Sequence, residues 1–332
     1  MPINATVCEV LAGLEKGKPF YVSGETIAGN LNISRAAVWK AVNALKRDGY
    51  EIESAANKGY RLVRGPDRLY AEGIRAGLLD FNRGLNVFVR QSVSSTNDEA
   101  KVLAINGAAH GTLIAAEEQS GGRGRYSRSF YSPFGTGLYM SVVLRPGLKA
   151  SEAPIVTVAA ALAVCRSIRG LTGLSPAIKW VNDVMLYDKK ICGILTEATS
   201  DAENGAVSSM VVGIGLNVSA RDGDFPPELH GVAGSIYPDG NPQVSRNAFA
   251  ASIINELLAL CDRQIVTERA FMSEYRELSC VLGKRIRYIR NGESGEGLAA
   301  DIDGDGRLIV IINGSEAPLA LDSGEVSITA YM

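Results

Sequence analysis

The sequence predicts an α+β protein of several domains: a winged helix-turn-helix, a central mixed α/β domain and a small β-barrel. Three observations support this. Helix-period apolar residues followed by a loose alternation fill residues 1–65. β-like runs interspersed with two long helical stretches fill residues 66–280. In residues 281–332, short strands are separated by Gly, Asp and Asn turns. We therefore expect three domains with these bounds.

Three short helices and a hairpin are expected in the first module. The apolar residues of each helix recur at i, i+3 and i+4, and Ser23 and Ser34 suit the N-caps of the second and third helices. Asp48-Gly49 is expected to end the third helix. The loose alternation from Tyr50 to Leu62, with a turn at Asn57-Lys58-Gly59, predicts a two-stranded wing. This order of elements is typical of a winged helix-turn-helix.

The outer face of the third helix is basic, as a DNA-recognition helix requires. Arg35 would lie closest to base edges in the major groove, and Lys58 and Arg61 on the wing would meet phosphates. The candidate DNA-binding residues are Ser34, Arg35, Lys40, Asn43 and Lys58. A helical adaptor with a solvated basic face is the alternative. Nine Lys and Arg against six Asp and Glu leave this module at +3, so tight binding would need a dimer on paired half-sites.

Composition and cysteine usage predict a soluble cytoplasmic protein. The 332 residues are 46% hydrophobic and 21% charged, with a formal net charge of −2, which is ordinary for a globular chain. The five cysteines form no CxxC pair and no secretory signal pattern is present, which favours reduced thiols. The longest apolar run, Ile155 to Cys165, is too short to span a bilayer, so no membrane partner is expected. Two histidines in all argue against a His-rich metal site or a hydrolase triad.

The rest of the chain is expected to form strands and helices in two groups. A linker is expected at Gly65-Pro66-Asp67. The central body then has four β-like runs and two helical stretches: Val87–Val89, Thr112–Ala116, Leu138–Leu144, Ser209–Gly213, Ala153–Arg169 and Ala248–Asp262. The tail has three short strands that fit a small barrel: Lys284–Tyr288, Gly295–Ile302 and Leu308–Ile312.

Two motifs suggest functions that their spacing does not support. Asp301-Ile302-Asp303-Gly304-Asp305-Gly306 begins like a calcium loop, but Ile312 holds the twelfth position, where a bidentate Glu is needed. We expect a hairpin turn there. Gly213-Ile214-Gly215 follows a strand but lacks the third glycine of a dinucleotide-binding motif, and no Walker-type phosphate loop occurs. Any nucleotide must therefore be held in another way.

The arginine-rich segment Gly121–Arg128 is the strongest functional signal. It has neither helical nor strand period, so a mobile loop is expected. Guanidinium groups offer planar forks of donors that suit phosphates, and glycine lets the backbone approach an anion closely. A solvated basic surface loop is the alternative. A second polar cluster, Lys179–Asp183 followed by Lys190, favours function, because these cations together could hold a polyphosphate and stabilise developing charge.

Two further groups could complete such a site. Asn182 and Asp183 could bind Mg²⁺ or a ribose. Ser95, Thr96 and Asn97 add hydroxyl and amide groups. Thr96 with Glu99 also fits a capping box, and a helix N-terminus can itself receive a polar ligand.

The order of these motifs resembles that of biotin protein ligases. The motifs are Ser-Ser-Thr-Asn, Glu-Gln-Ser-Gly-Gly-Arg-Gly-Arg, Ser-Pro-Phe-Gly, Lys-Trp-x-Asn-Asp, Lys-Lys-Ile-x-Gly-Ile-Leu-x-Glu and Gly-Ile-Gly-Leu-Asn-Val. With the winged helix, the whole chain resembles the bifunctional type, which is both ligase and repressor of the biotin operon. The resemblance implies a class II synthetase-like catalytic domain and an SH3-like C-terminal barrel.

The resemblance also implies a two-step reaction. Biotin and MgATP would give biotinyl-5′-adenylate and pyrophosphate. The ε-amine of one lysine on a biotin carboxyl carrier protein, part of acetyl-CoA carboxylase or another biotin-dependent carboxylase, would then take the biotin and release AMP. The adenylate would also be the corepressor: it would order the arginine loop, favour a homodimer and raise affinity for operator DNA of biotin-synthesis genes.

Roles carry over to the matching residues. The residues expected to bind biotin are Ser95, Thr96, Asn97, Gln119, Arg123, Gly124, Arg125 and Lys190. Those expected to bind ATP or the adenylate are Arg123, Arg125, Arg128, Lys179, Asn182 and Asn217. Lys190, Arg125 and Asp183 would be catalytic, with Lys190 at the carboxylate–phosphate junction. No metal ligand is certain; Mg²⁺ would accompany ATP, and Asp183 is a candidate ligand.

Three positions depart from the commonest family pattern. Val181 stands where many members have Pro, Cys192 where Ala is frequent, and Phe130 where Trp is frequent. All three keep apolar bulk, so tuning is expected rather than loss of activity. Three other functions stay open: a DNA-binding biotin sensor without ligase activity, a related ligase such as a lipoate ligase, and a ligase whose N-terminal module is vestigial.

Overall fold

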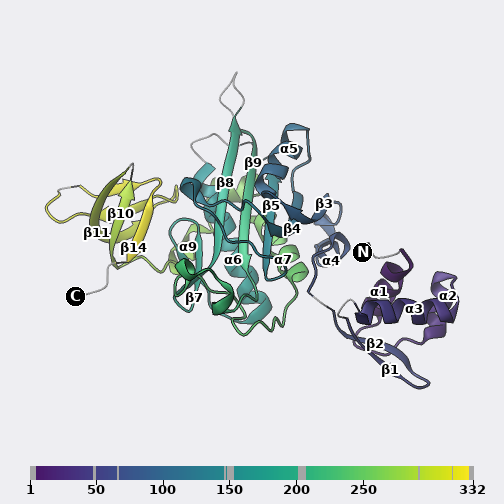
Figure 1. The fold of residues 1–332 in the computed structure, drawn as a ribbon. Helices are drawn as coiled ribbons and strands as arrows, with labels where there is room; N and C mark the ends of the chain where they lie inside the picture. The colour runs from purple at the N-terminus through teal and green to yellow at the C-terminus, as the bar shows by residue number, and fades with distance from the viewer. Residues whose placement is uncertain are drawn as a thin grey trace. The chain divides into compact units, whose positions relative to one another are not determined.

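The structure is a computed structural model that describes residues 5–47, 50–65, 67–145, 147, 153–200, 207–290, 292–315 and 317–328. The chain divides into two compact units, Met1–Arg68 and Leu69–Met332 (Figure 1). The expected helix end at Asp48-Gly49 and Pro66 of the expected linker lie outside the described residues.

The first unit has the three helices and the hairpin that the sequence predicts. They are α1 (Ala5–Gly17), α2 (Gly24–Leu31), α3 (Arg35–Arg47), β1 (Glu51–Ala55) and β2 (Gly59–Arg64), the two strands being antiparallel. The inward apolar residues of the helices form one buried cluster with Ile52 and Leu62 of the hairpin. Ser23 Oγ accepts a hydrogen bond from Thr26 N at 2.9 Å, and Ser34 Oγ accepts one from Ala37 N at 3.1 Å, so both serines act as the expected caps.

The second unit is built on a seven-stranded sheet of order β3-β4-β5-β9-β8-β7-β6. The strands are β3 (Val87–Val93), β4 (Thr112–Gln119), β5 (Gly137–Leu144), β6 (Ala177–Lys179), β7 (Asp183–Leu186), β8 (Lys189–Ser200) and β9 (Val207–Asn217). β3 and β4 are parallel, and every other neighbouring pair is antiparallel. The sequence predicted strands within β3, β4, β5 and β9 but not β6, β7 or β8, which carry the second polar cluster.

Helices cover both faces of this sheet. They are α4 (Ala71–Ala76), α5 (Thr96–Ile105), α6 (Ala153–Thr172), α7 (Arg246–Leu260), α8 (Arg263–Glu268) and α9 (Met272–Glu277). Successive strand residues face opposite sides. Leu113 and Ala115 of β4 therefore pack into the core with α6 and α7, whereas Ile114 packs against Ala100 and Ala104 of α5.

Helix α6 lies in the core of the second unit. Its segment Pro154–Thr172 is long and apolar enough to cross a membrane, but 67% of that window is buried inside the protein. The run from Ile155 to Cys165 that stands out in the sequence forms the buried middle of this longer helix. The apolar length of α6 is therefore accounted for by packing between the sheet and α7.

The chain ends in a five-stranded antiparallel sheet of order β13-β12-β11-β10-β14. Its strands are β10 (Arg285–Arg290), β11 (Glu293–Ile302), β12 (Leu308–Ile311), β13 (Leu319–Leu321) and β14 (Glu325–Ile328). Ile302 and Leu308 are fully buried in the same cluster as the central sheet. Between them Gly306 N donates to Asp303 O at 3.1 Å, which confirms a hairpin turn where the calcium-like motif stands.

Thr96 and Glu99 do not form the capping box that their spacing fits, so that expectation is wrong. Ser95 is the N-cap of α5 and makes no side-chain capping bond. Thr96 Oγ1 instead donates to Gln119 Oε1 at 3.1 Å, and Glu99 accepts from Arg90 Nε at 3.2 Å. The side chains that fit a local cap by spacing are taken by partners on β4 and β3.

Candidate active site

A cavity of about 530 Å³ in the second unit gathers the predicted site residues. Its walls include these predicted residues: Ser95, Thr96, Asn97, Gln119, Arg123, Gly124, Arg125, Arg128, Lys179, Asn182, Asp183 and Lys190. They come from the start of α5, the end of β4, the arginine loop and strands β6 to β8. Gly324, Glu325 and Val326 of the C-terminal sheet complete the wall. A volume of this size suits a small-molecule ligand of several rings.

One end of the cavity is an ordered network of neutral polar groups. Gln119 Oε1 accepts from Thr96 N at 2.8 Å and from Thr96 Oγ1 at 3.1 Å, while Gln119 Nε2 donates to Ser132 Oγ at 3.0 Å. Ser95 and Thr96 are each only 3% exposed. Donors and acceptors fixed in this way can recognise a planar polar group with little loss of side-chain entropy.

Asn97 is held from below this end. Its Nδ2 donates to Glu197 Oε2 at 2.7 Å, and its Oδ1 accepts from Ser141 Oγ at 2.6 Å. Lys101 Nζ lies 2.5 Å from Glu197 Oε1. Burial raises the pKa of Glu197, but the hydrogen bonds from Lys101 and Asn97 outweigh it, so that its pKa lies below the ordinary value.

Glycines make room on the floor of the cavity. One cross-strand row runs from Lys179 through Asp183, Gly193 and Gly215 to Tyr139. A Cβ on Gly215 would lie 2.5 Å from a ring carbon of Phe130, and one on Gly193 would lie 3.2 Å from the same ring. The glycines therefore let Phe130 lie against the sheet, edge-on to Tyr139 with a centroid separation of 6.4 Å.

Each arginine of the loop has an acceptor. Arg123 pairs with Asp98, Arg125 Nη1 donates to Asn182 Oδ1 at 2.9 Å, and Arg128 Nη2 donates to Glu325 Oε2 at 2.6 Å. The three arginine side chains are not buried, so an anionic ligand can reach their guanidinium groups.

The backbone shapes this loop into a narrow turn. Gly124 N donates to Arg128 O at 2.7 Å, and Phe130 N donates to Gly122 O at 2.8 Å. Tyr126 and Ser127 have φ of 55° and 57°, in the left-handed region. The sequence predicted a loop here; the structure shows one conformation of it, with Arg125 aimed at the polar cluster of β6 and β7.

Lys190 and Asp183 face each other at the charged end of the cavity. Lys190 Nζ lies 2.7 Å from Asp183 Oδ1, with side-chain exposures of 33% and 22%. Asp183 Oδ1 is otherwise buried without a hydrogen-bond partner. Asn182 is fixed to β8 by Nδ2 donating to Ile194 O at 3.0 Å. A half-buried ammonium and a fixed amide beside a carboxylate suit the binding of phosphate and metal.

Asn217, predicted to bind ATP, does not line the cavity. Its Nδ2 donates to Gly234 O at 2.9 Å, and Gly234 N in turn donates to Lys190 O at 2.9 Å. Asn217 therefore supports the segment next to Lys190. Sequence reasoning assigned no role to Ser132, Ser141 or Glu197, although Ser132 and Glu197 lie within the motifs that carried the resemblance. Ser141 had no such signal.

The described residues hold no group of three or more His, Cys, Asp or Glu side chains that could bind a metal by themselves. Within the cavity, Asp183 and Asp188 are the carboxylates from β7 and the turn that follows it. An ion bound there would need further oxygen ligands from a substrate.

The first unit presents its predicted DNA-binding residues at the surface. Arg35 and Lys40 on α3 and Lys58 in the hairpin turn are exposed, and Asn43 is partly exposed. Trp39, between them on the same helix, is 58% exposed. Arg61, expected at phosphates, pairs with Glu53 Oε2 at 2.6 Å, and its guanidinium carbon lies 4.9 Å from the centroid of the Tyr21 ring.

Three family models match the chain. They describe the biotin/lipoate A/B protein ligase family over residues 89–217, an HTH domain over residues 9–61 and the biotin protein ligase C terminal domain over residues 281–328.

Named relatives cover most of the chain. The bifunctional ligase/repressor BirA of Bacillus spizizenii is 40% identical over 241 residues, 73% of this chain and 72% of the relative. BirA of Escherichia coli K12 is 28% identical over 331 residues, 99% of this chain and 98% of the relative. The solved structure of a biotin protein ligase from Aquifex aeolicus in complex with biotin and ATP has a TM-score of 0.61 at 24% identity, covering 74% and 99% of the two chains. At that identity, the structural likeness shows the fold.

Proposed function

The chain belongs to the biotin protein ligase family, and from that premise we propose that it is an ATP-dependent biotin protein ligase that also represses transcription. The observation that carries the proposal is one cavity with a neutral polar network at one end and Lys190, Arg125 and Asn182 at the other. Biotin has a neutral ureido ring and a carboxylate tail, and ATP brings phosphates. The two ends of the cavity match those two chemistries.

The neutral end would bind the bicyclic ring of biotin. Ser95, Thr96 and Gln119 would hydrogen-bond the ureido group, and Asn97, held by Glu197 and Ser141, would support them. The glycines of β8 and β9 let Phe130 lie against the sheet, and the ring of biotin would lie beside Phe130. Arg123 and Gly124 would close over the tail.

The charged end would carry out adenylation. A carboxylate oxygen of biotin attacks the α-phosphorus of ATP, and the bond to pyrophosphate breaks. Lys190 and Arg125 would stabilise the charge that develops on the phosphoryl oxygens. Arg128, Lys179 and Asn182 would hold the nucleotide. Asn217 would act indirectly, through the segment beside Lys190.

The second step transfers biotin to the acceptor. The ε-amine of a lysine on a biotin carboxyl carrier protein attacks the acyl carbon, AMP leaves with the electron pair of the C–O bond, and the amine loses a proton. Lys190 would stabilise the departing phosphate. Acetyl-CoA carboxylase or another biotin-dependent carboxylase would supply the acceptor.

Mg²⁺ would enter with ATP. The Oδ1 of Asp183 is buried and accepts no hydrogen bond, and its ion-pair partner is Lys190; a carboxylate oxygen there fits that ion, and Asp188 lies on the same wall. These residues would hold Mg²⁺ together with phosphate oxygens, and the ion would supply neutralising charge.

We propose three domains with the bounds 1–65, 66–280 and 281–332. The mixed, mainly antiparallel sheet between helices supports a class II synthetase-like centre, and five short antiparallel strands support an SH3-like barrel.

The repressor function would use the first unit. Arg35, Lys40 and Asn43 on α3 would read the major groove of operator DNA, with Ser34 and Lys58 at phosphates. Biotinyl-5′-adenylate would favour a homodimer. Because the dimer is the form that binds the operator, a ligand that increases the population of the dimer also raises the affinity for operator DNA. We place the protein in the cytoplasm, where ATP, carboxylases and operator DNA occur together.

A biotinylation assay tests the ligase function. The protein is incubated with MgATP, biotin and a biotin carboxyl carrier domain, and the acceptor is probed with labelled streptavidin. We expect signal that requires ATP and the acceptor lysine. A parallel reaction with lipoate tests whether the protein is a lipoate ligase. Lipoylation without biotinylation would overturn the proposal. If neither product forms, the ligase function is rejected and a biotin sensor remains as the alternative.

A gel shift tests the repressor function. Operator DNA from biotin-synthesis genes should be bound more tightly when biotin and ATP are added together than with either alone. Equal affinity in all conditions would reject control by the adenylate.

A further inference from the structure

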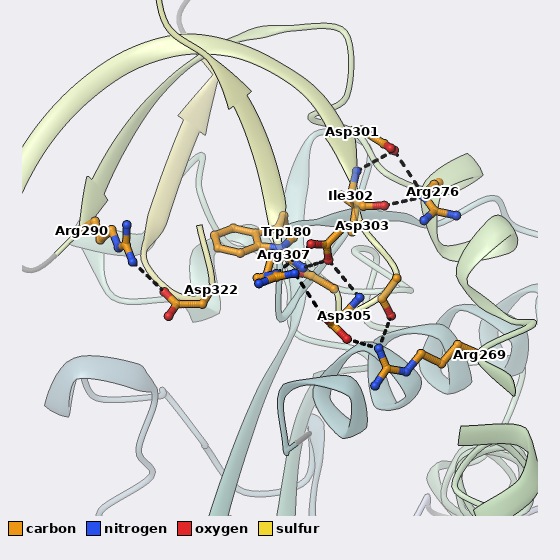
Figure 2. A network of polar contacts seen from close by, with 12 residues as sticks. Trp180, Arg269, Arg276, Arg290, Asp301, Ile302, Asp303, Asp305, Arg307 and Asp322 are labelled. Atoms are coloured by element: carbon orange, nitrogen blue, oxygen red, sulfur yellow. Dashed lines mark hydrogen bonds and ion pairs between the residues drawn. The ribbon is translucent and has the colours of Figure 1, made fainter. Parts of the chain in front are cut away.

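We propose that the turn Asp303–Arg307, between β11 and β12, is a positioning element that holds Trp180 and thereby the nucleotide-binding segment Lys179–Asp183. This inference rests on the proposed ligase function. The turn includes Asp303–Gly306 of the calcium-like motif, to which neither the ligase nor the repressor function assigns a role. Figure 2 shows that its acidic side chains point toward arginines.

The central contact is a single buried hydrogen bond. Trp180 Nε1 donates to Gly306 O at 2.8 Å, and the indole is only 3% exposed (Figure 2). Trp180 also lines the cavity. Because Lys179 precedes it and Asn182 and Asp183 follow closely, moving the indole would move the groups proposed to hold the nucleotide.

The same segment is anchored from behind at two other points. Ile178 exchanges backbone hydrogen bonds with Leu278 O and Cys280 N at 2.7 and 2.9 Å. The fully buried Tyr275 donates from its hydroxyl to Val181 O at 3.0 Å. Of these anchors, the one at Trp180 joins its indole to a backbone carbonyl in the turn between β11 and β12 of the C-terminal sheet.

Arginines fix the turn itself. Arg269 donates to Gly304 O at 2.9 Å and pairs with Asp305, while Arg307 pairs with Asp303 at 2.7 Å and Asp305 at 3.0 Å (Figure 2). Arg276 of α9 donates to Ile302 O at 2.5 Å. Guanidinium groups thus meet the carboxylates that a calcium loop would offer to an ion.

The position of Gly306 requires glycine. Its φ is +80°, and an added Cβ would lie 2.9 Å from Cγ2 of the fully buried Val158 of α6. The turn therefore packs directly on α6. This packing, together with the ion pairs of the turn, positions the carbonyl of Gly306 against Trp180.

Two disruptive variants, one conservative variant and one control test this positioning role. Trp180→Phe removes the N–H and keeps an aromatic ring. Arg269→Gln loosens the turn from outside the cavity, and Arg269→Lys keeps the charge. Arg290→Gln, the control, breaks the Arg290–Asp322 pair of the same sheet without changing a residue of the turn (Figure 2).

Steady-state pyrophosphate release is measured against ATP, and biotin affinity is measured separately. We expect Trp180→Phe to raise KM for ATP about tenfold, since displacement of binding groups by about 1 Å costs that much or more. Arg269→Gln should also raise KM for ATP, and Arg269→Lys should have a KM closer to that of wild type. Arg290→Gln should keep the wild-type KM for ATP. All of these variants should keep the wild-type affinity for biotin. Normal ATP kinetics in both Trp180→Phe and Arg269→Gln, with only a lower melting temperature, would overturn the proposal.

A fluorescence measurement separates this inference from the ligase function. Trp39 and Trp180 are the two tryptophans of the chain, so in a Trp39→Phe background the emission comes from Trp180. In that background, Arg269→Gln should expose the Trp180 indole and increase quenching of its fluorescence by acrylamide, even if the protein had no ligase activity. Unchanged quenching would contradict the inference. If Trp180→Phe does not fold, the variants Arg269→Gln and Arg269→Lys and this quenching measurement still test the positioning role. Wild-type protein that releases no pyrophosphate would instead reject the ligase proposal.

Discussion

Lys190 Nζ on β8 and Asp183 Oδ1 on β7 lie 2.7 Å apart in the wall of the cavity. The Asp183 carboxylate pairs with the Lys190 ammonium and holds it in place. A phosphate oxygen of an anionic substrate can replace that carboxylate as the partner of Lys190.

Loss of the Lys190 ammonium is the most direct test of that end. We expect Lys190→Met to lower kcat for adenylation about 100- to 1,000-fold, the usual cost of removing one preorganised charge from a transition state. Rapid-quench measurement of adenylate formation checks this. Lys189→Met is the matched control, because Lys189 pairs with the exposed Asp222. A Lys190→Met enzyme as fast as the control would remove Lys190 from the mechanism.

A methyl group on the cavity floor should expel Phe130. In Gly215→Ala the new Cβ would lie 2.5 Å from the Phe130 ring, and overpacking of this kind costs about 1–3 kcal/mol. We expect weaker biotin binding by calorimetry, and partial recovery in Gly215→Ala with Phe130→Leu. Gly170→Ala, which has open space around its Cβ, should keep biotin affinity. Wild-type affinity in Gly215→Ala would show that Phe130 does not shape the biotin site.

Glu197 should make stability depend on acid pH. Its pKa lies below the ordinary value of 4.5, because hydrogen bonds from Lys101 and Asn97 outweigh its burial. Its stabilising contribution is therefore complete above that ordinary value and is lost as pH falls through the lowered pKa. After allowance for partial exposure, we expect Glu197→Gln to cost about 0.5–1 kcal/mol near pH 7, with the difference from wild type shrinking below pH 4.

Urea unfolding of wild type and variant at several pH values measures this difference. Glu72→Gln, in a surface pair with a side-chain exposure of 79% for Glu72, should show almost none at any pH. A Glu197→Gln difference that grew toward acid pH would give the pKa shift the wrong sign.

The DNA-binding face can be separated from catalysis by charge-matched variants. Arg35→Ala on α3 should weaken operator binding by about 1–3 kcal/mol if the side chain reaches a base edge, with biotinylation unchanged. Lys16→Ala removes the same charge from the exposed end of α1 and should weaken binding little. Fluorescence anisotropy with labelled operator measures both, and equal losses would mean that Arg35 supplies only general attraction.

The sequence alone was sufficient wherever local rules apply. Apolar spacing and the two serine caps predicted α1 to α3, and alternation predicted the hairpin, because helix period and capping depend on neighbours within a few residues. The absence of Glu at position 312 favoured a hairpin turn over a calcium loop, and the structure has that turn at Asp303–Arg307. The motifs also identified residues that the cavity brings together, although they come from separate segments.

Only the tertiary structure decided how those residues are arranged. Strands β6 and β7 escaped prediction because they are only three and four residues long. Ile178, Val184 and Leu186 face the core, and residues next to them line the cavity. The sequence favoured a local cap for Thr96, but Gln119 on β4 competes for its hydroxyl. Asn217 donates a hydrogen bond to Gly234 O beside Lys190, and Gly306 O accepts one from Trp180. Cross-strand register and long-range hydrogen bonds join positions far apart in the chain, so no local pattern encodes them.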